Sequence, residues 1–271
     1  MKRMNYYLAA LLLLGLSMSS CKKEETTSDP IITTSEDNSE VSALFDDIDN
    51  ETNDVNAFKS EMVDTVPSTG TRTITIDTTG GQKVITIAFT NYVNGKNTRV
   101  KNGKIIVTIA GAYMDQAEPF EKVVTFQDFY VDDNKIEGTR TVTKNANNPL
   151  EFNITMENAK ITFSDGTSYT RTLENRTRTW SAGSTTATVW DDEYDITGSA
   201  SGVNRKGENY THTITTALHV ATICPYIESG VISIVVGEKT ATIDYGTGGC
   251  DRLATVTYNG KTHNILLRGG R

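Results

Sequence analysis

The chain has 271 residues and a net charge of −8, with a mass of 29.7 kDa and a pI of about 5.0. This length allows one large domain or two small ones. Because an acidic surface repels phosphate backbones, the charge argues against a nucleic-acid partner.

The first twenty residues have the three zones of a secretory signal. Lys2 and Arg3 are basic, residues 6–16 are apolar, and residues 17–20 are small and mostly polar. The apolar run is too short to cross a bilayer of about 30 Å. We therefore predict that residues 1–20 are a signal peptide.

Cys21 follows this segment directly, and Met18–Cys21 resembles a bacterial lipobox: an apolar residue, two small residues and a cysteine. The resemblance implies cleavage before Cys21, diacylglycerol on its thiol and acylation of the new amine. Since each buried methylene contributes about 0.8 kcal/mol, three acyl chains anchor a protein firmly to a membrane. The alternative is an ordinary cleaved signal with a coincidental cysteine.

Two charge pairs come next. Lys22–Glu25 reads Lys-Lys-Glu-Glu and resembles the lysine-plus-acidic export signal of surface lipoproteins of the Bacteroidota type. That resemblance implies the outer leaflet of an outer membrane, with the protein exposed at the cell surface.

A polar stretch and then a helical pattern follow the cysteine. Residues 21–40 are rich in Thr, Ser, Asp and Glu, which predicts a flexible tether. Residues 41–66 predict one or two short amphipathic helices. The apolar spacing i, i+3, i+4, i+7 is that of Val41, Leu44, Phe45 and Ile48.

From residue 71 to residue 268 apolar side chains alternate with polar ones, as in Ile85, Ile87 and Phe89. This period of two predicts β-strands. Turn signals such as Asn259–Gly260 follow one another too closely to leave room for crossover helices. We predict a single all-β domain of about a dozen strands or more in a long antiparallel meander.

The stretch 170–179, Thr-Arg-Thr-Leu-Glu-Asn-Arg-Thr-Arg-Thr, has almost no apolar side chain. Such a strand fits an open, curved sheet whose solvent-facing side carries Thr, Arg and Glu. A barrel and a sandwich are the alternative architectures. We expect the helical segment 41–66 to cover the buried face.

Two cysteines, Cys224 and Cys250, remain for a disulfide. Export places them in an oxidising compartment, so we predict that they pair. The strands 231–236 and 239–245 flank a two-residue turn and predict a hairpin. In the register of this hairpin, Cys224 and Cys250 are one residue away from being directly opposite each other. We expect a one-residue bulge in residues 245–249 to bring them opposite.

The chain has three histidines. His212 and His219 are seven residues apart, so a regular strand directs them to opposite faces. The sequence contains no H-x-H or H-E-x-x-H motif, and we predict no metal site and no cofactor. It also has no G-x-S-x-G, P-loop or G-x-G-x-x-G motif, so we predict no catalytic residue. We expect cross-strand partners to satisfy the histidines.

The strongest candidate binding residues lie close together in the sequence, and they are Trp180, Trp190, Asp191, Asp192 and Tyr194. Exposed aromatic faces beside carboxylates suit sugar stacking. The alternative, which we favour, is that the tryptophan rings fill the edge of a thin core.

Two further resemblances concern the cell surface. Asp64-Thr65-Val66 resembles the O-glycosylation signal of exported Bacteroidota proteins. The segments "YDITGSASGVNRKGENYTHTITT", "CPYIESGVISI" and "TATIDYGTGGCDRLATVTYNGKTHNILL" resemble a widespread set of uncharacterised Bacteroidota lipoproteins, which implies an all-β surface protein. Those proteins carry Tyr-Gly-Asp-Gly-x-Cys-Asp before a final hairpin, and Thr247-Gly248-Gly249 departs from that pattern.

The sequence thus favours a lipid-anchored surface protein that acts as a non-enzymatic binding or scaffold module. Its expected partners are the membrane, through Cys21, and a surface glycan or protein. The alternative is a glycan-binding or glycan-degrading surface protein.

Overall fold

The computed structural model describes residues 29–54, 68–79, 81–94, 99–111, 119–186, 188 and 190–267. Within them it holds one helix, α1 (Pro30–Asp54), and thirteen strands. The strands are β1 (Thr69–Asp77), β2 (Lys83–Val93), β3 (Val100–Ala110), β4 (Glu121–Val131), β5 (Asn134–Asn145), β6 (Asn148–Thr162), β7 (Ser168–Ala182), β8 (Glu193–Val203), β9 (Asn209–Ala221), β10 (Ser229–Val236), β11 (Lys239–Thr247), β12 (Leu253–Tyr258) and β13 (Lys261–Leu266).

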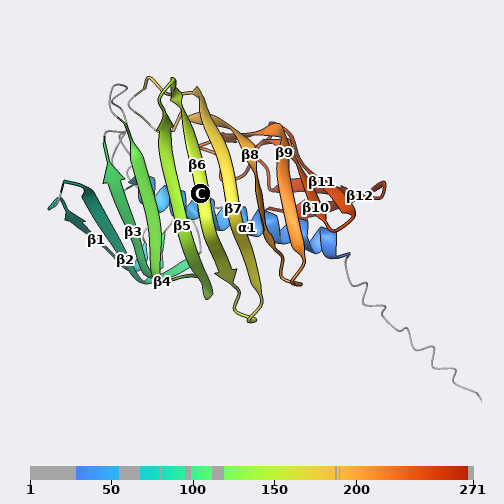
Figure 1. Cartoon of the computed structure of the whole chain (residues 1–271), viewed down its shortest axis with the longest axis horizontal. Coiled ribbons are helices and arrows are strands. Elements are labelled where there is room, and N and C mark those ends of the chain that lie inside the picture. The colour runs from blue at the N-terminus through green and yellow to red at the C-terminus, as the bar shows by residue number, and fades with distance from the viewer. Residues whose placement is uncertain are drawn as a thin grey trace, which may run out of the picture.

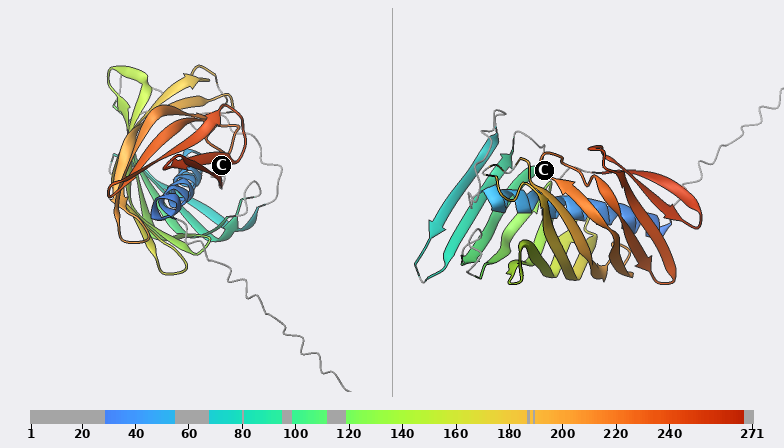
Figure 2. Two further views of the ribbon diagram at one scale, coloured as in Figure 1. Left: turned by 90° about the vertical axis from the view of Figure 1, so that its right-hand side faces the viewer. Right: turned by 90° about the horizontal axis from the view of Figure 1, so that it is seen from above.

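All thirteen strands form one sheet in sequence order, and each strand pairs antiparallel with the next. This arrangement confirms the predicted all-β meander. The sheet is open, with β1 at one end of the strand order and β13 at the other (Figure 1). It curls around α1, which lies along its concave side (Figure 2).

The alternation of side chains explains how the sheet and the helix form one core. Ile85 and Ile87 of β2 are fully buried and pair with the buried Val107 and Ile105 of β3. The intervening residues of both strands are less buried. The apolar face of the sheet therefore points inward, where Leu44 and the other apolar residues of α1 join the same core.

Three glycines bend the sheet. Gly138, Gly198 and Gly230 have φ of 126°, 127° and 111°, and each lies at a register shift between neighbouring strands. A Cβ at Gly198 would lie 2.2 Å from the carbonyl oxygen of Asn175. Only glycine fits such positions, and bulges of this kind increase strand bending.

The helix differs from the prediction. It begins at Pro30, inside the stretch 21–40 that was expected to be a tether, and it is a single helix as far as Asp54. The Asp29 carboxylate accepts a hydrogen bond from the Ile31 N–H (3.2 Å), and proline is favoured in the first turn. Most polar residues of 30–40 are buried or half-buried, because the helix packs against the sheet, and Glu36 is exposed. The expected helical residues 55–66 lie outside the described residues.

Several predicted features also lie outside the described residues, namely the signal peptide 1–20, the lipidation residue Cys21 and the O-glycosylation candidate Thr65. They stay predictions. None of the described helical residues forms a stretch that is long and apolar enough to cross a membrane.

Candidate functional site

The predicted aromatic site does not assemble on the surface. Trp180 lies on the inner face of β7 and is only 8 % exposed. Its ring stacks on Tyr194 of β8, with centroids 5.6 Å apart, and meets Phe152 edge-on at 5.7 Å. The rings of Trp180 and Tyr194 therefore belong to the core.

The acidic residues of that site point in different directions. Asp192 is buried and accepts a hydrogen bond from the Tyr194 hydroxyl (3.1 Å). Asp191 is exposed and accepts one from the Thr186 hydroxyl (2.8 Å). Trp190 is half-buried. Of the five candidates, Asp191 is exposed, Trp190 and Tyr194 are half-buried, and Trp180 and Asp192 are buried.

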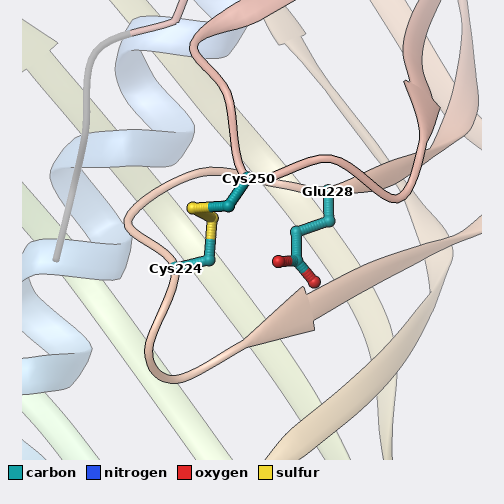
Figure 3. Close-up of side chains that lie close together, drawn as sticks. All are labelled: Cys224, Glu228 and Cys250. Atoms are coloured by element: carbon teal, nitrogen blue, oxygen red, sulfur yellow. A yellow bond between two sulfur atoms is a disulfide. The ribbon is translucent and has the colours of Figure 1, made fainter.

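The predicted cysteine pair is present. Cys224 and Cys250 form a disulfide with Sγ atoms 2.17 Å apart and Cα atoms 5.7 Å apart (Figure 3). Cys224 lies in the β9–β10 connection and Cys250 in the β11–β12 connection, both beyond the strand ends. The disulfide thus joins two loops.

The hairpin that led to this prediction has the expected register, with Val236 opposite Lys239. A bulge opposite Gly230 places Ser229 across from Thr247, within the predicted stretch 245–249. It does not bring the cysteines into one ladder, as the prediction required, because it shifts the register in the other direction. Loop geometry brings them together instead.

The most unusual feature is one that the sequence analysis missed: a buried charged interface between α1 and the sheet. The helix carries eight acidic side chains and no basic one. Cationic side chains of the sheet's inner face and, in the case of Arg205, of the β8–β9 turn reach toward it. The ion pairs join Asp37 to Arg205 (3.3 Å), Asp47 to Lys101 (2.9 Å), Asp49 to Arg140 (2.6 Å), and Glu51 to Lys101 (2.5 Å) and Arg72 (3.0 Å).

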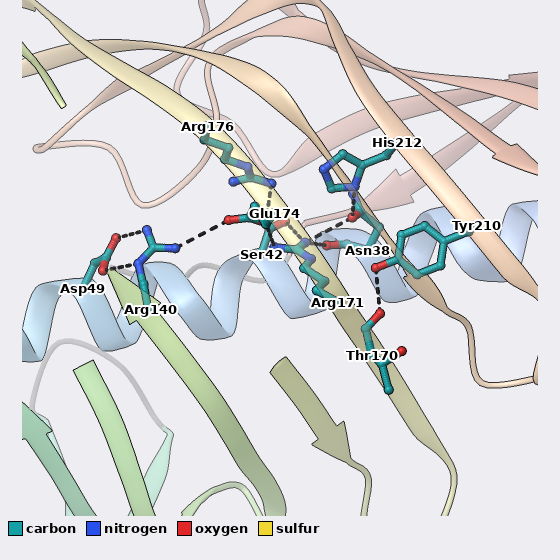
Figure 4. Close-up of polar contacts among 10 residues, drawn as sticks. All are labelled: Asn38, Ser42, Asp49, Arg140, Thr170, Arg171, Glu174, Arg176, Tyr210 and His212. Carbon is teal, nitrogen blue, oxygen red and sulfur yellow. Dashed lines mark hydrogen bonds and ion pairs between the residues drawn. The ribbon is translucent and has the colours of Figure 1, made fainter. Parts of the chain in front are cut away.

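We call this interface the polar seam. From α1 it contains Asn38, Ser42, Asp47, Asp49 and Glu51, and from the sheet Lys101, Lys122, Arg140, Arg171, Glu174, Arg176 and His212. Figure 4 shows its central part, where β5, β7 and β9 face the helix.

Glu174 is the centre of the polar seam. Its carboxylate is fully buried and lies 2.7 Å from Arg171, 3.5 Å from Arg140 and 3.5 Å from Arg176. Burial alone would raise the pKa of Glu174, but Arg176, Arg171 and Arg140 together lower it to about 2. The group is therefore an anion that three guanidinium groups share.

Arg171 and His212 connect this centre to the helix. Arg171 donates hydrogen bonds to the Asn38 amide oxygen (3.1 Å) and to the Ser42 hydroxyl (2.8 Å). His212 Nδ1 lies 2.9 Å from the same Asn38 oxygen. Burial, with Arg171 and Arg176 nearby, holds the pKa of His212 well below its usual range. The imidazole is therefore neutral, and Nδ1 is the donor.

Lys122 lies at the end of the polar seam where the positive charges outnumber the negative ones. Its Nζ donates to the Thr52 hydroxyl (3.3 Å). Burial lowers the pKa of Lys122 to about 8, and the nearby Arg178 and Arg140 add to this effect while Asp49 opposes it. Lys122 is thus a cation that its surroundings only partly stabilise.

The helix fills the concave side closely. A hollow beside it, lined by Ser39, Ser42, Asp46 and Tyr245 among others, has a volume of about 20 Å³, which is room for about one water molecule. The charged groups of the polar seam bind one another.

One sequence signal could have revealed the polar seam. Residues 30–54 contain acidic side chains without a single basic one, while 170–179 carries three arginines at strand positions. The Arg and Glu side chains of 170–179 were expected to face solvent, and that expectation was wrong. Arg171 and Glu174 point inward, toward the opposite charge on the helix.

Comparison with known proteins adds no functional assignment. No protein-family model, no curated protein and no solved structure matches the chain.

Proposed function

We propose that this chain is a lipid-anchored cell-surface protein of the Bacteroidota type that serves as a non-enzymatic binding or scaffold module. The lipobox-like Met18–Cys21 and the Lys-Lys-Glu-Glu stretch support the anchor and the location. The eight residues between Cys21 and Pro30 span at most about 28 Å when extended. The anchor would therefore hold the sheet close to the membrane.

The observation that carries the non-enzymatic assignment is the filled concave face. In a curved sheet this face is the natural place for a ligand cavity, and here α1 occupies it (Figure 2). The ionisable groups there, such as Glu174 and His212, are engaged with one another. A partner would meet the outer face or an edge of the sheet instead.

Lipid labelling and surface proteolysis test the proposal in cells. We expect labelled palmitate on the wild-type protein, no label on Cys21→Ser, and cleavage of the wild-type protein by a protease added to intact cells. Cys224→Ser serves as the matched control and should keep its label. Undiminished labelling of Cys21→Ser would refute the anchor, and protection from the protease would refute the surface location.

A glycan-directed role is the second candidate, and it rests on Trp190 and Asp191, which keep accessible surface. A glycan array that compares the wild-type protein with Trp190→Ala tests it, with Trp180→Phe as the control for a core aromatic residue. Binding that only Trp190→Ala abolishes would favour this role. Absence of binding and of turnover across polysaccharides would leave the first proposal.

A further inference from the structure

A second group of ionisable side chains lies on the convex face, away from the polar seam. Glu193 and Asp195 come from β8, His219 from β9, and Glu228 from the residue just before β10. Leu218 is buried in the core, so the neighbouring His219 points to the opposite, convex face. Asp195 is directly across from His219 in the β8–β9 ladder.

The orientation of the imidazole is fixed. His219 Nδ1 lies 2.9 Å from Asp195 Oδ1, and a carboxylate can only accept at this distance. Nδ1 therefore carries the proton, and in the neutral ring the lone pair is on Nε2. A carboxylate that holds one ring nitrogen while the other faces outward is the arrangement found around metal-bound histidines.

The Nε2 atom faces two more carboxylates at distances that suit metal ligands better than hydrogen bonds. It lies 3.5 Å from Glu193 Oε2 and 3.9 Å from Glu228 Oε2, whereas a hydrogen bond of this kind is about 2.7–3.2 Å long. Ligand atoms at about 2.0–2.1 Å from a tetrahedral Zn²⁺ are about 3.3–3.4 Å apart. The first distance nearly matches that separation. The second is longer, and the Glu193 and Glu228 oxygens are not within 4.8 Å of each other, so the Glu193 side chain must turn toward an ion for the three ligands to meet.

The charges of the cluster favour a cation. Among the described residues, the ion pairs of Glu193, Asp195 and Glu228 all involve His219. Three carboxylates thus converge on one imidazole. A divalent metal would neutralise the excess negative charge without requiring the ring to be protonated.

The position of Glu228 is well defined. Its N–H donates to the His219 carbonyl oxygen (2.9 Å), and its own carbonyl oxygen accepts from the Gly248 N–H (2.9 Å). The Cys224–Cys250 disulfide lies beside its side chain (Figure 3). Glu228 is 15 % exposed, whereas Glu193 is 44 % exposed and can swing toward an incoming ion.

We propose that His219 Nε2, Glu193 and Glu228 form a binding site for a divalent transition metal on the convex face, with Zn²⁺ as the best fit to one nitrogen and two oxygen ligands. Asp195 is a positioning residue that orients the imidazole. Three protein ligands leave a coordination position for water or for a side chain of a partner. The disulfide sulfurs are not ligands, because they carry no thiolate charge.

Titration calorimetry with Zn²⁺ on the full chain, purified in detergent and freed of metal with a chelator, tests the site. We expect one ion per chain. His219→Ala and Glu228→Gln should each weaken binding at least tenfold, and Asp195→Asn should weaken it about ten- to hundredfold through loss of ring orientation. His263→Ala removes an exposed histidine of β13 and should leave the affinity unchanged.

Two outcomes would overturn the proposal. If the wild-type chain binds no Zn²⁺, the cluster is only a set of polar contacts around His219. If His219→Ala binds as tightly as the wild-type chain while both have the same circular dichroism spectrum, Zn²⁺ binds elsewhere. The ring resonances of His219 in NMR provide a second readout, because they should shift on addition of Zn²⁺ while those of His263 stay unchanged.

Discussion

Individual residues of the polar seam carry charges where a sheet normally buries apolar groups. Glu174 is fully buried, and Arg171 is 1 % exposed. Burying ions costs several kcal/mol each, and their attraction offsets this cost only if every partner is present. The polar seam is therefore sensitive to the removal of any one charge, although the intact set adds little net stability.

The substitution Glu174→Gln tests this sensitivity. It leaves Arg140, Arg171 and Arg176 without their shared anion, and we expect it to lower the free energy of unfolding by about 3–5 kcal/mol. Urea denaturation followed by circular dichroism measures the change. Glu157→Gln, on the exposed side of β6, is the matched control and should change the stability by less than about 0.5 kcal/mol. Equal effects of the two substitutions would contradict the role of Glu174.

Lys122 predicts a pH dependence of stability. Its pKa is about 8 in the folded chain, below the ordinary value of 10.5. Between these two values the unfolded chain binds a proton that the folded chain does not, so the stability contributed by Lys122 rises with pH from about 8 to about 10. The gain is up to about 3 kcal/mol.

The effect of Lys122 is measured as the difference in urea midpoint between the wild-type chain and a Lys122 variant, because other groups also titrate in this pH range. Urea midpoints of the wild-type chain and of Lys122→Met at pH 7, 8.5 and 9.5 should diverge in favour of the wild-type chain as the pH rises. Lys160→Met, which removes an exposed lysine of β6, should show no such trend. A constant difference between the wild-type chain and Lys122→Met would contradict the lowered pKa.

At the scale of elements, the strands were predictable and the helix was not. Alternation and turn residues are local signals, so they predict the meander from β1 to β13 without knowledge of contacts. Local signals gave the wrong prediction for residues 30–40, because their polar side chains are typical of a solvent-exposed tether. Ser35 and Asn38 are fully buried in the structure. Ser35 donates to the Ile31 carbonyl oxygen within the helix, and the Asn38 side chain meets Arg171 and His212 on the sheet.

The polar seam and the His219 cluster were not predicted from the sequence, because their contacts join residues that are far apart in the chain. Asp49 and Arg140 are 91 residues apart, and Asn38 and Arg171 are 133 apart. No local period links such pairs. His219 was correctly separated from His212, which faces inward. Its carboxylate neighbours come from β8 and from the residue just before β10, and only the register of the sheet brings them together.

At the scale of the whole molecule, the open sheet leaves a strand with little cover. β1 pairs only with β2 in the described sheet, and nearly all of its residues are exposed. Ile74 and Ile76 are 45 % and 52 % exposed. An edge strand with exposed apolar side chains such as these is a template for pairing with another chain.

We therefore expect Ile76→Lys to reduce concentration-dependent self-association, measured by light scattering, while it changes the free energy of unfolding by less than about 0.5 kcal/mol. A lysine on an edge strand discourages pairing between chains. Thr213→Lys places the same charge on an exposed position of the central strand β9. If both variants reduce association equally, net charge rather than the edge is responsible.

The position of α1 constrains the order in which parts of the chain can fold. Each hairpin of the sheet joins neighbours in sequence and can form as soon as its two strands exist. The helix comes before every strand, yet it packs against β10, β11 and β12, and Asp29 meets Lys239 across 210 residues. The helix can therefore complete its packing only after β10, β11 and β12 have been synthesised, and the native state requires segments that are far apart in the sequence to meet.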